Sequence, residues 1–465
     1  MSNKSYHSLL CGVIGIFLFI VLWNINRESF WGDEAFSVYS IGGGGQLNNI
    51  PLQNWDFQSF WHIILNDNHP FLYNLCLKIY AHLLGTSDFV LRFFSAIWIL
   101  FGAITSYIIL YKHHYKSLAL LYIIFFLLAP QTIYYAQECR NYAMLLCLTS
   151  IFCTLLYLVL ESMHDRLKLT HQFWYFLGIL LCGTALVLTH YYAYVFVFCV
   201  GVVFLLQSIL TRKFFIPLFI CFGLMGLAGI IWISIHHFYG GFLDRMDTAW
   251  VFEYSLWWLL FSIILSCFGK FAWILIACSL LFAFRYSGFT PYRQYAPFLY
   301  IVGLEFIIVS LIFLNLSQTM TGRFFIEIHI LIYLFIANVL LYSQAFLRYL
   351  KPIVLAIALT LTAHSFFISA TYHKEDLRTA SEYIAKHFDS AQCLLPVRWI
   401  AYRRYLPQFE AIEKPLVQKE CDLIYLTADR EDTNFADTRI ALEQHNIKDY
   451  KLISFNGAVV VIKEK

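Results

Sequence analysis

Charged side chains are scarce in this chain. Only 13% of its 465 residues are Asp, Glu, Lys or Arg, whereas a soluble protein averages about 25%. Hydrophobic residues make up 60% of the chain, aromatic residues 19%, and the mean hydropathy is +0.66. This balance excludes an ordinary soluble protein and predicts a polytopic membrane protein.

Two classes of motif are also absent. The twelve cysteines are scattered, mostly within apolar runs, and none forms a CxxC pair. Metal–thiolate and redox sites are therefore disfavoured, and most of the cysteines are expected to be small core residues. A net charge of +3 without a basic stripe predicts no nucleic-acid partner.

Long apolar runs predict eleven membrane-spanning helices, since about 17–25 residues cross a hydrocarbon core. The first run has no small-residue cleavage site and is expected to be a retained helix, not a signal peptide. Gly269-Lys270 interrupts the run from Tyr254 to Phe268, which we interpret as an interfacial or re-entrant helix. The predicted spans are residues 9–25, 89–111, 117–134, 143–160, 174–189, 192–210, 214–235, 270–285, 297–316, 323–342 and 352–371.

Basic residues in the short loops indicate the orientation. Under this span count, five loops with two basic residues each fall on one side, which the positive-inside rule makes cytoplasmic together with the N-terminus. The first outer loop (26–88), the loop 236–253 and the chain after about residue 372 are then extracytoplasmic. The basic pairs are Lys112 and Lys116, Arg166 and Lys168, Arg212 and Lys213, Arg285 and Arg293, and Arg348 and Lys351.

The composition changes after residue 372, where charged residues become frequent and spanning runs end. We expect a transmembrane domain over 1–372 and a small soluble extracytoplasmic α/β domain over 373–465. Cys393 and Cys421 of this domain either form a disulfide or are two core thiols. A helix is indicated by Leu377, Ala380, Ile384 and Phe388, and strands by Cys421–Thr427 and Ala458–Ile462.

An acidic pair, Asp33-Glu34, follows the first predicted span and is flanked by Phe30, Trp31 and Phe36. A half-desolvated carboxylate pair at a membrane boundary is costly, and it binds a cation, pairs with a base or holds a proton. The alternative is a solvated start of a loop. We favour a functional site, because other polar motifs fall on the same side of the membrane.

A second polar group, Asp67 and His69, lies at the end of the first outer loop. With Asp33 and Glu34 it could complete a metal site, since oxygen ligands suit Mg²⁺ or Mn²⁺ and an added imidazole suits Mn²⁺ or Zn²⁺. The alternative is that Asp67 caps the next helix and His69 only hydrogen-bonds to it.

Two arginines are predicted on the same outer face. Arg140 lies near Glu138 in an apolar setting and must find an anion, which is Glu138 itself, a lipid headgroup or a substrate phosphate. Arg323 opens a late span, and His190 lies in an outer turn as a packing residue or a ligand. Such arginines, histidines and carboxylates together suit an anionic substrate and acid–base chemistry.

The order of these motifs resembles that of the protein-mannosyltransferase-like glycosyltransferases of C-type fold, whose bacterial members include the lipid A aminoarabinose transferase. The resemblance covers residues 1 to about 345. It rests on Asp33-Glu34, then His69-Pro70-Phe71-Leu72-Tyr73 and Leu91-Arg92-Phe93, then Tyr135-Ala136-Gln137-Glu138-Cys139-Arg140-Asn141-Tyr142, and finally Arg323-Phe324-Phe325.

The resemblance implies an all-α polytopic fold of the C type and an enzyme of the bacterial cytoplasmic membrane. Such enzymes move a sugar from a polyprenyl-phosphate donor to a lipid, glycan or protein acceptor outside the membrane. A donor held in the bilayer needs no nucleotide-binding loop, and none of the Walker or dinucleotide type is present.

The resemblance also implies roles for individual residues. Asp33, with Glu34 beside it, matches the catalytic carboxylate or metal contact, and a divalent cation would be held by Asp33, Glu34 and His69. Relatives have a carboxylate and a lysine just before the proline, where this chain has Asn68-His69, so the phosphate contact and the metal dependence stay open. The implied substrate contacts are Asp67, His69, Tyr73, Glu138, Arg140, Tyr142, His190 and Arg323.

Three other classes of protein share some of these features. A secondary transporter should show ionisable residues in mid-span and broken helices in matching halves, whereas here polar residues gather at one interface and no repeat is visible. Another C-type transferase or polymerase of lipid-linked oligosaccharides is the nearest alternative, and a non-catalytic assembly protein is the third.

Overall fold

A computed structural model of the chain describes residues 3–42, 57–165, 167–168, 172–241, 256–287, 290–316, 322–342, 350–371, 374–388, 394–396, 404–406, 424–428, 443, 450–456 and 458–463. The chain forms two compact units. Unit 1 comprises Met1–Trp23, Ile64–Tyr73 and Ser95–Ala370, and unit 2 comprises Asn24–Ile63, Asn74–Phe94 and Thr371–Lys465. Unit 2 thus combines most of the first outer loop with the C-terminal tail.

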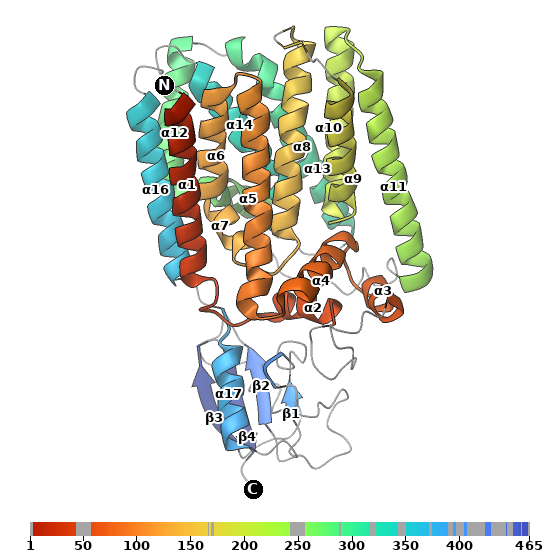
Figure 1. Ribbon diagram of the computed structural model, residues 1–465, viewed down its shortest axis with the longest axis vertical. Coiled ribbons are helices and arrows are strands. Elements are labelled where there is room, and N and C mark those ends of the chain that lie inside the picture. Colours follow the sequence, from red (N-terminus) through yellow and green to blue (C-terminus); the bar gives the residue numbers. More distant parts are fainter. Residues whose placement is uncertain are drawn as a thin grey trace. The chain divides into compact units, whose positions relative to one another are not determined.

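Unit 1 is a bundle of long apolar helices (Figure 1). Among the described residues, nine helices are long and apolar enough to cross a membrane, and α6 with α7 would make a tenth. The prediction of a polytopic helical membrane protein is confirmed, and every predicted span has its helix, although α9 has only 16 residues. The helices are α1 Asn3–Asn24, α5 Asp88–Lys112, α6 Lys116–Leu128, α7 Pro130–Ala136, α8 Tyr142–Met163, α9 Gln172–Val187, α10 Tyr192–Thr211, α11 Ile216–Gly240, α12 Leu256–Ser287, α13 Ala296–Leu316, α14 Ile326–Tyr342 and α16 Leu350–Thr371, with 3₁₀ turns η3 Thr290–Tyr295 and η4 Gly322–Phe325.

Helix α8 forms the centre of this bundle. Its residues from Tyr142 to Glu161 are all buried, and it packs against α9 and α14. Helix α11 is the opposite case, because Ile220, Leu227 and Ile230 expose about half or more of their surface, at 57%, 52% and 64%. An apolar face of this kind suits contact with lipid tails.

The predicted span 117–134 is bent. Helix α6 ends at Leu128 and α7 begins at Pro130, with an angle of 60° between them. Proline disfavours helical geometry in the residue before it, and Ala129 is accordingly extended, with φ −63° and ψ 136°. The bend is therefore encoded locally by Pro130.

The interpretation of 254–268 as a separate interfacial or re-entrant helix is corrected. The residues from Leu256 onward form the first half of α12, and Leu259–Arg285 is a single membrane-length segment with a break at Gly269, whose φ is 70°. Along α12, Leu259 packs with Ile328, the Cys267 carbonyl accepts from the Tyr333 hydroxyl at 3.1 Å, and Ala283 packs with Val339. Both halves therefore follow α14 in one direction and make one crossing.

Unit 2 contains short helices and a mixed sheet. Its helices are α2 Gly32–Ser40, most of α3 Phe57–Leu65 and α4 Leu72–Leu84, the start of α5 up to Phe94, and α17 Leu377–His387. The sheet has the order β1-β2-β4-β3, with β1 and β2 parallel and the other pairs antiparallel. The strands are β1 Leu394–Pro396, β2 Ile424–Ala428, β3 Tyr450–Phe455 and β4 Ala458–Lys463.

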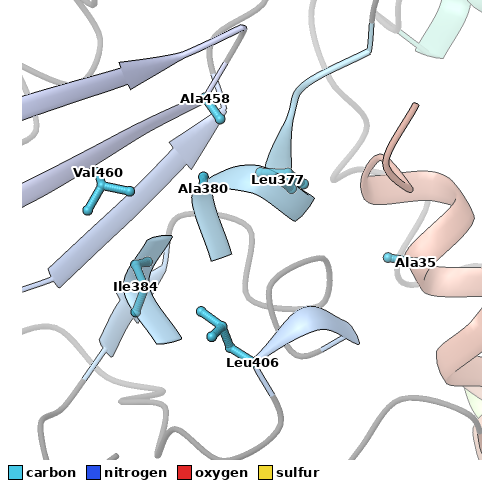
Figure 2. Close-up of a cluster of buried hydrophobic side chains, with 7 residues drawn as sticks. All are labelled: Ala35, Leu377, Ala380, Ile384, Leu406, Ala458 and Val460. Carbon is cyan, nitrogen blue, oxygen red and sulfur yellow. The ribbon is translucent and has the colours of Figure 1, made fainter. Parts of the chain in front are cut away.

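The predicted α/β tail is confirmed, and its helix buries the apolar stripe expected from the sequence. Figure 2 shows Leu377, Ala380 and Ile384 of α17 in a cluster that includes β4 and also Ala35 of α2. The core of unit 2 is therefore built from both the tail and the first outer loop. Cys393 and Cys421 lie outside the described residues.

Candidate functional site

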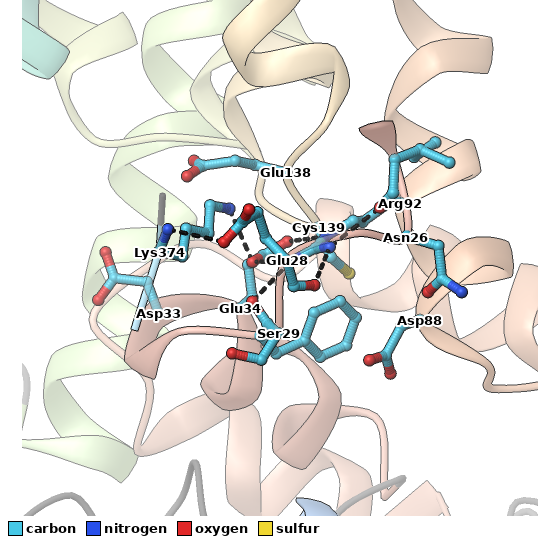
Figure 3. A network of polar contacts seen from close by, with 12 residues as sticks. Asn26, Glu28, Ser29, Asp33, Glu34, Asp88, Arg92, Glu138, Cys139 and Lys374 are labelled. Atoms are coloured by element: carbon cyan, nitrogen blue, oxygen red, sulfur yellow. Dashed lines mark hydrogen bonds and ion pairs between the residues drawn. The ribbon is translucent and has the colours of Figure 1, made fainter. Parts of the chain in front are cut away.

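Glu34 lies at the centre of a buried ion network in unit 2 (Figure 3). Its side chain is fully buried. Arg92 binds it in a bidentate manner, with Nε 2.8 Å from Oε1 and Nη2 2.7 Å from Oε2. Lys374 adds a third contact, with Nζ 2.8 Å from Oε2. One carboxylate is thus shared by two cations from distant parts of the chain.

These cations determine the ionisation of Glu34. Burial alone raises the pKa of a carboxyl group, but the charges and hydrogen bonds of Arg92 and Lys374 outweigh burial and hold the pKa of Glu34 at about 2. Glu34 is therefore ionised at any physiological pH. A group in this state is not suited to hold a proton during turnover.

The remaining donors of Arg92 organise the chain between α1 and α2. Nη1 donates to the carbonyl oxygens of Ile25 at 3.0 Å and Glu28 at 2.7 Å, and Nη2 donates to that of Ser29 at 2.9 Å. The guanidinium also lies over the Phe30 ring, 4.8 Å from its centroid. Arg378 adds to these contacts, because its Nη1 donates to the carbonyl of Asn26 at 3.1 Å and its Nη2 to that of Glu28 at 3.3 Å. Two arginines therefore supply donors for the carbonyls of this segment.

Asp33 has a different environment from its neighbour. It lies in the first turn of α2, is half-buried, and its carbonyl accepts from the Ser37 hydroxyl at 3.4 Å. Successive helical residues point about 100° apart, so the side chains of Asp33 and Glu34 leave α2 in different directions. The positive end of the helix dipole favours an ionised carboxylate at this position.

The predicted substrate residues Asp67, His69, His190, Arg140 and Tyr142 come together in unit 1. Nδ1 of His69 lies 3.3 Å from Oδ1 of Asp67. The His69 and His190 rings are 5.4 Å apart, and those of His190 and Tyr142 are 5.8 Å apart. The Arg140 guanidinium lies 6.0 Å from the Tyr142 ring centroid. Three predicted motifs therefore form one polar cluster.

Backbone contacts explain why these motifs meet. The Leu72 N–H donates to the Leu188 carbonyl at 3.1 Å, which fixes the chain after His69 against the turn that precedes α10. The Asn141 amide donates to the Thr189 carbonyl at 3.2 Å. These two bonds place the end of the first outer loop and the start of α8 at the same turn, where His190 lies.

The charges in the cluster follow from the environment of each group. Burial raises the pKa of Asp67, but His69, the Arg140 charge and the Asn68 N–H outweigh it, and the pKa is lowered below 3.8. Burial, with the charges of His69 and Arg140, holds the pKa of His190 well below 6.5. At neutral pH the cluster therefore has an ionised Asp67, a neutral His190 and a cationic Arg140.

The remaining predicted contacts lie around this cluster. The Tyr73 hydroxyl is 3.7 Å from the Cys139 sulfur, beside Arg140 in the chain. Glu138 is buried, and its carbonyl accepts from the Arg140 N–H at 2.9 Å. Arg323 lies in η4 and is half-buried. The ring of the next residue, Phe324, packs at a tilt against that of Tyr192, with centroids 4.2 Å apart, two residues after His190.

The predicted divalent cation does not fit the residues proposed for it. Both oxygens of Glu34 already bind Arg92 and Lys374, and a carboxylate held by two cations is a poor metal ligand. Within the described residues, no three His, Cys, Asp or Glu side chains form a group suited to a metal ion. We therefore derive no step through a metal.

Sequence patterns gave no role to Arg92 or Lys374, although they are the partners of Glu34. Asp88 has a similar set of ionic and hydrogen-bond partners. Nη2 of Arg378 lies 2.7 Å from its Oδ2, and Nη2 of Arg404 lies 2.8 Å from its Oδ1. The Tyr405 hydroxyl donates to Oδ2 at 2.9 Å. A signal did exist, because Arg92 and Asp88 are charged residues in the first turns of an apolar span, and such residues need partners.

The fold is that of known structures. No model of a protein family matches the sequence, and no curated protein matches it. The structure is similar to that of ArnT from Cupriavidus metallidurans in the apo state, with 12% sequence identity and a TM-score of 0.65 over 99% of this chain and 98% of that one. A second structure, ArnT bound to undecaprenyl phosphate, gives 11% identity and a TM-score of 0.64 over the same shares. The fold expected from the resemblance is confirmed.

Proposed function

We propose that this protein is a membrane glycosyltransferase that moves a sugar from a polyprenyl-phosphate donor to an extracytoplasmic lipid, glycan or protein acceptor. The observation that carries the proposal is the full-length likeness to ArnT, one structure of which is bound to undecaprenyl phosphate. The polar cluster of unit 1 supports it, because Arg140 beside the Asp67–His69 pair offers a guanidinium fork of the kind that matches phosphate oxygens.

The roles follow from the chemistry of transfer. The bond between the sugar C1 and the phosphate oxygen breaks through an oxocarbenium-like state, and the polyprenyl phosphate leaves as an anion. Arg140 and Arg323 stabilise that charge, while Asp67 orients His69 through the 3.3 Å contact. Asp33 accepts the proton of the acceptor hydroxyl or amine as a new bond to C1 forms.

The test is a donor-turnover assay. The full-length protein is reconstituted in liposomes with a polyprenyl-phosphate-linked sugar, and release of free polyprenyl phosphate is followed with a panel of lipid, glycan and peptide acceptors. We expect turnover that depends on one acceptor class. Absence of turnover with every pentose and hexose donor tested, from a protein that is folded and monodisperse, would refute the proposal.

We expect the arginine that contacts the phosphate to resist replacement by lysine. Arg140→Lys and Arg323→Lys keep the charge but lose the planar fork that matches two phosphate oxygens. At the true contact, the donor KM should rise or kcat should fall by about tenfold or more, because a charged hydrogen bond is worth about 1.5–3 kcal/mol. Kinetics over a range of donor concentrations measure this.

A structural arginine should behave differently in the same experiment. Its lysine variant would lower the temperature of aggregation in detergent and leave the kinetics of the surviving protein unchanged. If both variants bind donor, transfer sugar and melt as the wild type does, neither arginine contacts the phosphate, and His69 becomes the first candidate.

The proposed orientation has its own prediction. His387 is an exposed residue of α17 and Lys112 is an exposed residue at the end of α5. A His387→Cys variant should react with a membrane-impermeant thiol reagent applied from outside intact spheroplasts, whereas Lys112→Cys should react only after lysis. The native cysteines set the background in the parent protein. The reverse labelling pattern would place the tail in the cytoplasm and contradict the proposal of an extracytoplasmic acceptor.

A further inference from the structure

We propose that Lys374, at the start of the tail, is a positioning residue of the active site, which holds the α2 turn that carries Asp33 through its contact with Glu34. The inference rests on the proposed function, in which Asp33 is the base. It makes the tail part of the catalytic apparatus and not an appended module.

The first step is that Lys374 is not needed to neutralise Glu34. Arg92 already forms two hydrogen bonds to that carboxylate, at 2.8 and 2.7 Å. Lysine is almost never buried without a specific partner, yet the Lys374 side chain is only 6% exposed and its Nζ shares Oε2 with Arg92. Buried ion pairs contribute little net stability, and their best-attested use is to fix one arrangement of the chain.

The second step is that the backbone around Lys374 is fixed to the same loop. The Lys374 N–H donates to Oε2 of Glu28 at 3.0 Å, and the Leu377 N–H donates to the Ser29 hydroxyl at 3.1 Å. The Ser29 hydroxyl in turn donates to the Glu375 carbonyl. Side chain and backbone of the first tail residues therefore hold the segment just before α2.

The third step concerns rotation of α2. Glu34 is held by Arg92 and Lys374, and the next residue, Ala35, packs in the tail core with Leu377 and Ala380 (Figure 2). Two adjacent residues fixed on one side leave the helix no freedom to turn about its axis. The direction of Asp33 is then set by contacts that come from the tail.

The experiment compares three single variants of the full-length protein. Lys374→Met keeps the length and apolar stem but removes the charge, and Lys374→Arg keeps the charge. Lys386→Met, on the exposed face of α17, is the matched control. We expect Lys374→Met to lower kcat by up to about 10²-fold, as small misplacements of catalytic groups do, with an unchanged donor KM. Lys374→Arg should restore kcat to within a few-fold, and the control should behave as wild type.

A double variant separates positioning from general damage. If Lys374 acts only through Glu34, Glu34→Gln/Lys374→Met should be no slower than Glu34→Gln alone. The proposal is overturned if Lys374→Met keeps kcat within twofold of wild type, or if the two losses multiply.

A second readout does not need activity. Asp33→Cys is modified with a thiol reagent, and the rate at position 33 is followed by mass spectrometry of its peptide. Adding Lys374→Met should change that rate several-fold, whereas adding Lys386→Met should not. An unchanged rate overturns the positioning role. If the wild type transfers no sugar, the proposed function fails while the labelling rate still decides the role of Lys374.

Discussion

Asp33→Asn is expected to lower the rate of sugar transfer by about 10²–10⁴-fold, the usual loss when a general base is removed. The amide keeps the volume of the side chain but cannot accept the acceptor's proton. Because Asp33 is half-buried at the start of α2 and the amide has the shape of the carboxylate, the protein should insert and fold normally. Donor turnover at saturating donor measures the effect.

Asp165→Asn is the matched control for this variant. Asp165 is a highly exposed residue, with 85% of its side chain accessible, in contact with Lys213. Exposed ion pairs contribute little, so this variant should transfer sugar at the wild-type rate. Activity of Asp33→Asn within a few-fold of wild type would remove Asp33 from the mechanism, and the base would have to be sought among the other carboxylates.

In the sequence Asp33 and Glu34 form one acidic pair, whereas in the structure the two side chains have different environments. The pattern predicted that an acidic pair at this place binds a cation, pairs with a base or holds a proton, and Glu34 pairs with Arg92 and Lys374. It could not show that only Glu34 is buried, because that depends on which side of α2 faces the tail. The catalytic assignment of Glu34 stays a prediction, and its ion contacts favour a structural role.

The spans were predictable because apolar length is a local property. The bend at Ala129 and the break at Gly269 are local as well, since one precedes a proline and the other is a glycine with positive φ. The sequence did not predict that the chain keeps one direction on both sides of Gly269. That direction is set by packing against α14, from Ile328 to Val339, and no short motif records it.

The ion network shows the limit of sequence reasoning most clearly. Arg92 is 58 residues and Lys374 is 340 residues from Glu34 along the chain. Nothing in the local pattern pairs them. The cluster around His190 was easier to predict from the sequence. In a membrane protein all outer turns lie at the same face, so a count of the spans is enough to show which turns share a face. That count brought Asp67, Arg140 and His190 to the same side.

Arg92→Met is expected to have the largest effect on stability. It removes one partner of a buried pair and leaves the carbonyls of Ile25, Glu28 and Ser29 without the donors described here. Breaking a buried ion pair costs about 3–5 kcal/mol, and Lys374 alone does not replace a bidentate contact. The measurement is the temperature at which half of the detergent-solubilised protein is lost from the monodisperse peak.

The pH dependence of this loss follows from Glu34. Its pKa is about 2 in the folded protein and 4.5 in an unperturbed glutamate side chain, so the ion network stabilises the fold fully above pH 4.5 and loses its effect as the pH falls toward 2. The difference between wild type and Arg92→Met should therefore be constant from pH 5 to 8 and shrink at lower pH. Arg27→Met is the control, because Arg27 is half-exposed and lies 3.8 Å from Glu28. Its free energy of unfolding should lie within about 1 kcal/mol of that of the wild type. If Arg92→Met unfolds at the same temperature as that control, the Glu34 network does not hold unit 2 together. The contacts of Asp88 with Arg378 and Arg404 must then do so instead.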